Sequence, residues 1–157
     1  MRSRFLLLAI ASLIAVVDTG AQTTTWRQCL SDSSPAAAIS ACTSIIILDP
    51  RNDGAFVNRG IAYRRAGDIE RAIKDYDEAI RLDSHYAQAY NNRGIIFLEM
   101  DEVDRAIADF NKAIAEEPDY ANAFRNRGLA WLHQRLFDRA NEDFDEASRL
   151  SHRQAVH

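Results

Sequence analysis

The chain has 157 residues, and its 47% hydrophobic and 27% charged content is that of a soluble globular protein. Its 19 basic and 23 acidic residues give a formal net charge of -4 at pH 7, and the basic residues are scattered. A mildly acidic chain without a basic cluster would be repelled by phosphates, which argues against nucleic acid as a partner.

An N-terminal leader is predicted for residues 1–21. Arg2 and Arg4 precede an apolar run of 13 residues, Phe5–Val17, which is shorter than the roughly 20 residues that a membrane-spanning helix needs. Polar residues end the run, and Ala21 is a small residue at a plausible cleavage site. We therefore expect a cleaved signal peptide and a periplasmic or secreted protein. The alternative is an uncleaved N-terminal anchor.

A short N-terminal unit is predicted for residues 22–52. It is expected to be helical near Trp26, and its second helix is expected over Ala36–Leu48. Ser34 can accept a hydrogen bond at the start of that second helix. Pro35 suits the first helical turn, where its missing N–H costs nothing.

The only two cysteines of the chain, Cys29 and Cys42, lie in this unit. Export would place them in an oxidising compartment, where an even number of cysteines predicts a disulfide. The bond would close a loop of about 14 residues and stabilise the unit by roughly 3 kcal/mol. The alternative is a pair of free, buried thiols.

Three tandem copies of one pattern follow, over residues 53–86, 87–120 and 121–154. Each copy has an aromatic residue, the tripeptide Asn-Arg-Gly, a second aromatic residue, an alanine and a third aromatic residue at the same offsets. Self-similarity at this period predicts stacked pairs of helices. The recurring residues are Phe56, Tyr90 and Phe124; Gly60, Gly94 and Gly128; Tyr63, Phe97 and Trp131; Ala72, Ala106 and Ala140; and Tyr76, Phe110 and Phe144.

Each copy is expected to form an amphipathic first helix, a short turn and a second helix that begins near Ile69, Val103 or Phe137. Only the first turn contains a glycine, Gly67, so the turn is less clearly marked in the other two copies. The recurring glycine and alanine are expected where the two helices cross, with the aromatic residues filling the space beside the crossing.

This pattern resembles the tetratricopeptide repeat family over residues 53–154. The resemblance implies an all-α fold, a right-handed superhelix of antiparallel helix pairs whose first helices line a concave face. The chain departs from the family pattern where arginine replaces leucine before each glycine, and where Pro118 alone keeps the closing proline. Residues 22–52 match only as a degenerate half-repeat.

The end of the stack is predicted from residues that change in the third copy. Isoleucines in the second helices of the first two copies are expected to pack on the copy that follows. Asn141 and Ser148 take their places in the third copy, so we expect the stack to end in water and the protein to be a monomer. Residues 155–157 are assigned to a tail, with fraying expected from Ser151 onward.

Each arginine of the Asn-Arg-Gly tripeptide has an aspartate sixteen residues later. The N-terminal half-repeat lacks both partners together. An internal ladder of ion pairs between helices therefore explains the spacing better than an anion-binding site. The expected structural pairs are Arg59–Asp75, Arg93–Asp109 and Arg127–Asp143.

If the chain follows the family, the exposed faces of the first helices form a groove for a peptide or helix of a partner protein. Ile61, Ile95 and Leu129 would form an apolar stripe, and nearby asparagines could bond to a peptide backbone. The alternative is that the N-terminal segment partly covers the stripe. The predicted groove comprises Asn58, Ile61, Arg64, Asn91, Asn92, Ile95, Leu98, Arg125, Asn126, Leu129 and Leu132, with Val57, Arg65, Gln88 and Asn122 as further candidates.

No sequence motif supports catalysis, a metal site or a cofactor. The four histidines are isolated or lie near the C-terminus, and the chain has no glycine-rich phosphate loop. The lysine and asparagine pattern by which some family members bind a C-terminal carboxylate is also absent. We predict a non-enzymatic scaffold for a protein partner. The alternative is a structural adaptor that assembles a cell-envelope complex through its convex or end surfaces.

Overall fold

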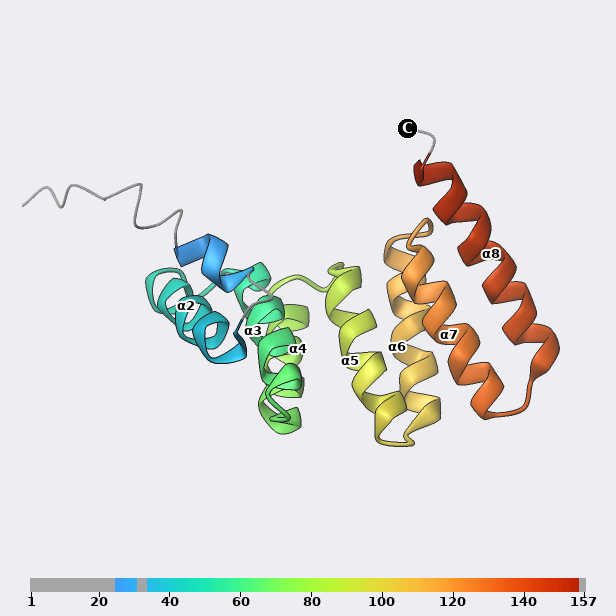
Figure 1. Cartoon of the computed structure of the whole chain (residues 1–157), viewed down its shortest axis with the longest axis horizontal. Coiled ribbons are helices and arrows are strands. Elements are labelled where there is room, and N and C mark those ends of the chain that lie inside the picture. The colour runs from blue at the N-terminus through green and yellow to red at the C-terminus, as the bar shows by residue number, and fades with distance from the viewer. Residues whose placement is uncertain (1–24, 31–33, 156–157) are drawn as a thin grey trace, which may run out of the picture.

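The computed structural model describes residues 25–30 and 34–155 (Figure 1). The predicted signal peptide lies outside the described residues. Within them, residues 25–29 form a short helix. The longer helices are α2 (Pro35–Leu48), α3 (Asp53–Arg65), α4 (Ile69–Leu82), α5 (Ala87–Glu99), α6 (Val103–Glu116), α7 (Ala121–His133) and α8 (Phe137–Ala155). No helix of the described part is both long and apolar enough to cross a membrane.

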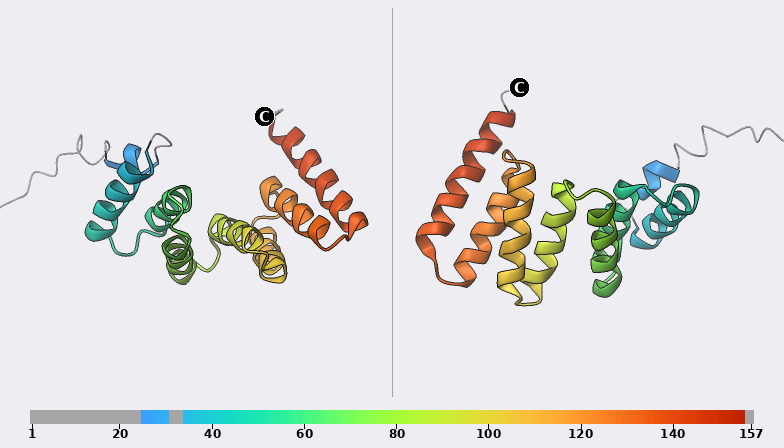
Figure 2. Two further views of the ribbon diagram at one scale, coloured as in Figure 1. Left: turned by 60° about the horizontal axis from the view of Figure 1, so that its bottom comes forward. Right: turned by 180° about the vertical axis from the view of Figure 1, so that it is seen from behind.

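The helices pair in chain order, α3 with α4, α5 with α6 and α7 with α8, and each pair packs on the next. Figure 2 shows the pairs following one another from α2 at one end to α8 at the other. The predicted all-α superhelix is confirmed. The second helices begin at Ile69, Val103 and Phe137, where the repeat pattern predicted them.

The turns inside the three pairs share one backbone conformation. Gly67, Asp101 and Arg135 have φ angles of 81°, 63° and 59°, in the left-handed region. In each turn the next residue donates its backbone N–H to a carbonyl five residues earlier, as Asp68 does to Tyr63 at 2.9 Å. Asp101 and Arg135 therefore form the same turn as glycine, although side chains disfavour this conformation.

The recurring glycines lie where the paired helices approach most closely. A Cβ at Gly60 would lie 2.6 Å from the ring of Tyr76, and a Cβ at Gly94 would lie 2.8 Å from the ring of Phe110. Gly128 has the same relation to Phe144 at 2.7 Å. The predicted crossing is confirmed, because at each of these glycines the aromatic ring of the second helix fills the space that a Cβ would need.

Isoleucines of the second helices join successive pairs. Ile73 of α4 packs against the cluster around Phe97 in the next pair, and Ile107 of α6 packs in the same cluster as Ala130. Ile46 of α2 packs on the first full pair in the same way. In the third copy, Asn141 and Ser148 are exposed, as predicted for the end of the stack.

The expected fraying from Ser151 is wrong, because α8 continues to Ala155. The position of the closing Pro118 is occupied in this copy by His152, which does not interrupt a helix. Leu150 is buried, and the hydroxyl of Ser151 donates to the carbonyl of Ala147 at 2.8 Å. Residues 156–157 lie outside the described part.

The N-terminal unit packs on the first full pair through α2. Its helix begins at Pro35, one residue earlier than predicted, and the side chain of Ser34 accepts a hydrogen bond from the N–H of Ala37 at 3.4 Å. Cys29 and Cys42 are both buried, with a Cα–Cα distance of 4.8 Å and their sulfurs within bonding distance. This geometry is that of a disulfide.

Candidate functional site

The first helices of the pairs lie on the inner side of the stack. Helix α3 contacts α5 and α5 contacts α7, whereas α4, α6 and α8 make no such contacts with one another in the described part of the chain. Helices on the inside of a curved stack lie closer together than those on the outside. We call the exposed side of α3, α5 and α7 the concave surface.

The apolar stripe of the concave surface becomes more exposed toward the C-terminus. Ile61 and Ile95 are half-buried, whereas Leu129 is 47% exposed and Leu132 is 39% exposed. Leu98 packs against the aromatic cluster of the second pair. No further pair follows α7 and α8 in the described chain, so Leu129 and Leu132 stay open to solvent.

The prediction is wrong for two of the groove residues, which are buried in the structure. Val57 is fully buried in the core of the first pair, and Asn91 is 3% exposed. The side-chain amide of Asn126 donates to the side-chain oxygen of Asn91 at 2.9 Å. Helix α7 covers this position of α5, whereas Arg125, the equivalent residue of α7, has no following pair to cover it and is exposed.

The predicted series of asparagines is not uniform. Asn126 is engaged with Asn91, and the amide nitrogen of Asn92 is buried without a hydrogen-bond partner among the described residues. Asn58 lines a small cavity of about 80 Å³ together with Leu30 and Ile61. The three side chains therefore do not present three equivalent amides to a ligand.

The N-terminal segment lies beside the first part of the stripe. Leu30 and Cys29 line the same small cavity as Ile61. The ring of Trp26 lies 3.8 Å from the position that a Cβ of Gly54 would occupy, at the start of α3. The most accessible part of the apolar stripe is consequently formed by α5 and α7.

The recurring arginines form the ladder that the spacing predicted. The guanidinium groups make paired hydrogen bonds to the carboxylates of the second helices, and the arginine side chains are only 17–20% exposed. The hydrogen bond to Asp75 raises the pKa of Arg59. The closest distances are 2.8 Å for Arg59–Asp75, 2.8 Å for Arg93–Asp109 and 2.6 Å for Arg127–Asp143.

Each arginine also has a second partner, which the sequence reasoning missed. Its remaining nitrogen reaches the residue sixteen positions earlier, in the second helix of the preceding unit: Thr43 at 3.1 Å, Asp77 at 2.5 Å and Asn111 at 2.7 Å. These polar residues recur at the repeat period, and that recurrence was the available signal. The ladder therefore joins neighbouring units and leaves no open anion-binding site.

The predicted groove residue Arg64 is also engaged. It forms two hydrogen bonds to Glu99 of the next pair, one of them 3.1 Å between Arg64 Nε and Glu99 Oε2. These hydrogen bonds raise the pKa of Arg64. The positive charge of this side chain is therefore compensated on the concave surface itself.

A cavity of about 600 Å³ opens beside the N-terminal turns of α5 and α7, and we call it the tyrosine cavity. Burial raises the pKa of Tyr86, with Asp53 and Asp83 adding to the effect, and burial together with Glu117 raises the pKa of Tyr120. The cavity is lined by Asp83, His85, Tyr86, Ala87, Gln88, Glu116, Glu117, Tyr120 and Asn122.

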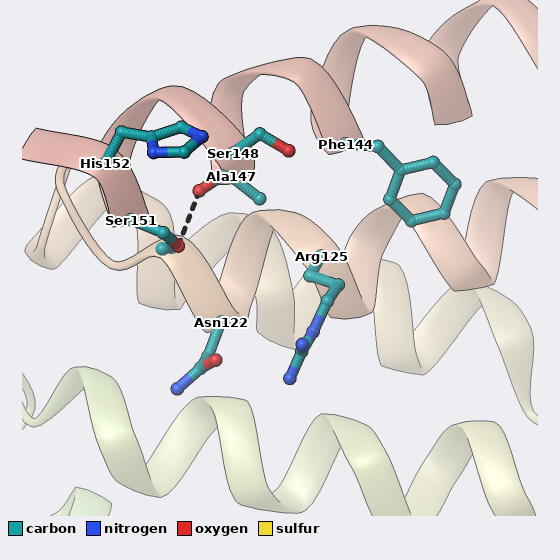
Figure 3. A pocket seen from close by; sticks show the side chains of 8 residues that line it. Asn122, Arg125, Phe144, Ala147, Ser148, Ser151 and His152 are labelled. Atoms are coloured by element: carbon teal, nitrogen blue, oxygen red, sulfur yellow. Dashed lines mark hydrogen bonds between the residues drawn. The ribbon is translucent and has the colours of Figure 1, made fainter. Parts of the chain in front are cut away.

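A second cavity, of about 290 Å³, lies between α7 and α8 at the end of the stack, and we call it the terminal cavity. Figure 3 shows Asn122 and Arg125 on one helix and Phe144, Ser148 and His152 on the other, with the hydrogen bond from Ser151 to Ala147 dashed. No carboxylate lines this cavity among the described residues. The two cavities share Asn122 and differ in the charge of their linings.

Nothing in residues 25–30 and 34–155 brings together three or more side chains that could hold a metal ion. His85 contacts Glu116 at 2.7 Å, and His133 contacts Asp101 at 3.5 Å. Both contacts join one pair to the next at exposed positions. They are ion pairs of the surface when the histidines are protonated.

Comparisons with known proteins agree with this geometry. A family model described as TPR repeat matches residues 60–101, and one described as Tetratricopeptide repeat matches residues 87–120. No curated protein matches the chain. Among solved structures, a crystal structure of MamA is 29% identical, with a TM-score of 0.70, and the match covers 78% of this chain and 72% of that one.

Two further structures are similar over a shorter part of the chain. The second TPR of Spaghetti (RPAP3), bound to the HSP90 peptide SRMEEVD, is 27% identical with a TM-score of 0.61, covering 64% of this chain and 94% of that one. The TPR domain of Arabidopsis OM64 is 28% identical with a TM-score of 0.60, covering 62% and 81%. The repeat pattern, the fold and these matches together show that the chain carries tetratricopeptide repeats, with the family models matching over residues 60–120.

Proposed function

We propose that the chain is a non-enzymatic scaffold that binds a peptide or helix of another protein on its concave surface. The observation that carries this proposal is the exposure of Leu129 and Leu132, which continue the stripe of Ile61 and Ile95 along the inner side of the stack. Exposed apolar side chains in a row are typical of surfaces that bind another protein. The peptide bound to the similar Spaghetti domain supports the same kind of function.

We also propose that the protein is exported and that its leader is removed. In this proposal it works as a monomer in the periplasm or outside the cell. The leader pattern of residues 1–21 supports this location. The closeness of Cys29 and Cys42 also supports it, because disulfides persist in oxidising compartments. Mass spectrometry of the purified protein would detect both the missing leader and the loss of two hydrogens at the cysteines.

The experiment combines crosslinking in the native compartment with a matched pair of variants. Leu129→Asp with Leu132→Asp places two charges on the exposed part of the stripe. Ile47→Asp with Leu48→Asp places the same charges on α2, where these side chains are 73% and 76% exposed. The partner identified by crosslinking is expected to be captured by the control and lost by the concave variant. Equal capture by both variants, with equal helicity by circular dichroism, would reject the concave surface.

An end surface is the second candidate for the binding function. Phe137 is 60% exposed and Leu136 is 39% exposed at the turn between α7 and α8. These residues could assemble the chain into a larger complex as a structural adaptor. Sedimentation at several concentrations separates the two functions, because self-assembly through this end would increase the mass, and Phe137→Asp would abolish the increase.

A further inference from the structure

We infer that the segment bound on the concave surface is basic and amphipathic, and that it places a lysine or arginine in the tyrosine cavity. This inference rests on the proposed function and specifies the partner. Three observations carry it: the position of the cavity beside the apolar stripe, the charge and chemistry of its lining, and the compensation of the positive charge of Arg64.

The tyrosine cavity adjoins the concave surface through two amide side chains. Gln88 lies in the first turn of α5 and Asn122 in the first turn of α7, and both line the cavity. Ile95 and Leu129 lie two turns further along the same helices. A bound segment that contacts the apolar stripe therefore passes close to the opening of the cavity.

The lining of the cavity carries an excess of negative charge. Glu116 has two basic neighbours, His85 at 2.7 Å and Lys112 at 3.4 Å. Asp83 accepts a hydrogen bond from the backbone N–H of His85 at 2.9 Å, and no ion pair found among the described residues involves Asp83 or Glu117. These two carboxylates remain available to a cation from outside, and the cavity walls concentrate their field.

The two tyrosines give the cavity the chemistry of a cation site beyond its charge. Aromatic rings attract ammonium and guanidinium groups through their electron-rich faces. The chain uses this contact within its own structure, since the guanidinium of Arg105 lies 3.7 Å from the ring centre of Phe97 and that of Arg139 lies 5.0 Å from Trp131. Tyr86 and Tyr120 line the cavity on equivalent positions of successive copies.

The rest of the concave surface offers little to an acidic segment. Arg64 is bound to Glu99, and the ladder arginines are held by their aspartates. Arg125 is the exception, because it is exposed and lines the terminal cavity, about one turn along α7 from Asn122. The net charge of -4 adds long-range attraction for a basic segment.

Two synthetic helical peptides of opposite charge test the inference on the full chain. The basic probe is LKKLLKLLKKLLKL, and the acidic probe is LEELLELLEELLEL, with SRMEEVD as a second acidic probe. Calorimetric titration is expected to show binding of the basic probe alone. Absence of that binding, or equal binding of either acidic probe, overturns the inference.

Matched variants then locate the site. Asp83→Asn with Glu117→Gln removes the two available carboxylates and keeps hydrogen-bond acceptors at both positions. Glu142→Gln with Asp145→Asn removes the same charge from exposed positions of α8. We expect the basic probe to bind the cavity variant about fivefold more weakly, and the control less than about twofold more weakly, because local charges act over short distances. Equal losses in both variants would mean that only net charge attracts the probe, and would overturn the inference.

The concave variant Leu129→Asp with Leu132→Asp separates failure of the inference from failure of the proposed function. Loss of the basic probe in the concave variant, with no loss in the cavity variant, keeps the concave function and rejects the cation site. Binding unchanged in the concave variant rejects the concave surface itself. Loss of binding in both variants supports both the concave surface and the cation site.

Discussion

The two ends of the stack close in opposite ways. At the N-terminal end, Cys29 is 3% exposed and Cys42 is fully buried, and their sulfurs lie at disulfide distance in the centre of a very short unit. At the C-terminal end, α8 is extended and presents Asn141 and Ser148 to solvent. The close cysteines at the N-terminal end make up for the small size of that unit. The polar residues of α8 suit a surface on which no further pair packs in the described chain.

The comparison shows that a repeat position has no fixed environment. Asn91 of the second copy is buried by the following pair, whereas the equivalent Arg125 of the third copy is exposed. Ile107 packs on the next pair, whereas its equivalent Asn141 lies in water. The terminal copy consequently carries the most exposed part of the apolar stripe, at Leu129 and Leu132.

The proposed disulfide between Cys29 and Cys42 is the contact whose removal is expected to change the N-terminal end most. Cys29→Ala with Cys42→Ala is expected to cost about 3 kcal/mol of stability, because the loop between the cysteines is no longer closed in the unfolded chain. The loss should appear as faster hydrogen exchange in α2 than in α5 and α6. Unchanged protection of α2 would show that packing alone holds the N-terminal end.

Glycine-to-alanine substitutions at the helix crossings test whether the central pair and the terminal pair lose the same stability. At Gly94 the new Cβ would meet Phe110 at 2.8 Å and the carbonyl of Ala106 at 3.2 Å, so Gly94→Ala is expected to cost about 2 kcal/mol. At Gly128 the nearest atoms all belong to Phe144, which is half-buried beside the terminal cavity and can shift. Gly128→Ala is therefore expected to be nearly neutral in urea unfolding, and equal costs would contradict the comparison.

The turns allow a smaller test in the stabilising direction. Arg135 adopts a left-handed conformation that costs a side-chain-bearing residue about 1 kcal/mol or slightly more. Arg135→Gly is expected to recover about that amount in urea unfolding, and Gly67→Ala to lose it in the first pair. A destabilised Arg135→Gly would mean that the arginine side chain makes contacts that outweigh the backbone strain.

The smallest expected effect concerns His85, whose hydrogen bond to Glu116 raises its pKa above 6.5. A raised pKa in the folded state means that the contact contributes most below pH 6.5, and that the contribution is lost as pH rises through the folded-state pKa. NMR titration should find a raised pKa for His85 and a value near 6.5 in Glu116→Gln. An unshifted value in the native protein would contradict the contact.

The repeat period predicted the helices and the crossings because both depend on contacts that recur in every copy. Gly60, Gly94 and Gly128 meet the same ring in the same way, so comparison of the copies identified them. The extension of α8 was not predicted, and the missing proline alone does not account for it, because the first copy also lacks the proline, at Ser84, and α4 ends at Leu82. What differs in the third copy is that no further pair follows α8 in the described chain.

The concave surface could be predicted only in outline. The apolar stripe follows from helical spacing, but the burial of Asn91 depends on how far α7 covers α5. The tyrosine cavity joins residues from two loops and three helices. Tyr86 and Tyr120 recur at the repeat period, but that recurrence does not show that a cavity opens between them. Such a site depends on the distance between neighbouring helix pairs, which cannot be predicted from the repeat pattern.

The arginine ladder makes the stack extensible. Arg93 bonds to Asp109, sixteen residues after it, and to Asp77, sixteen residues before it. Both separations are shorter than the repeat period of 34 residues. A gene that repeats residues 87–120 in tandem would carry all the donors and acceptors of the inserted joint with it. Inserted between the second and third copies, the extra module would leave both termini unchanged and lengthen the inner surface by one repeat.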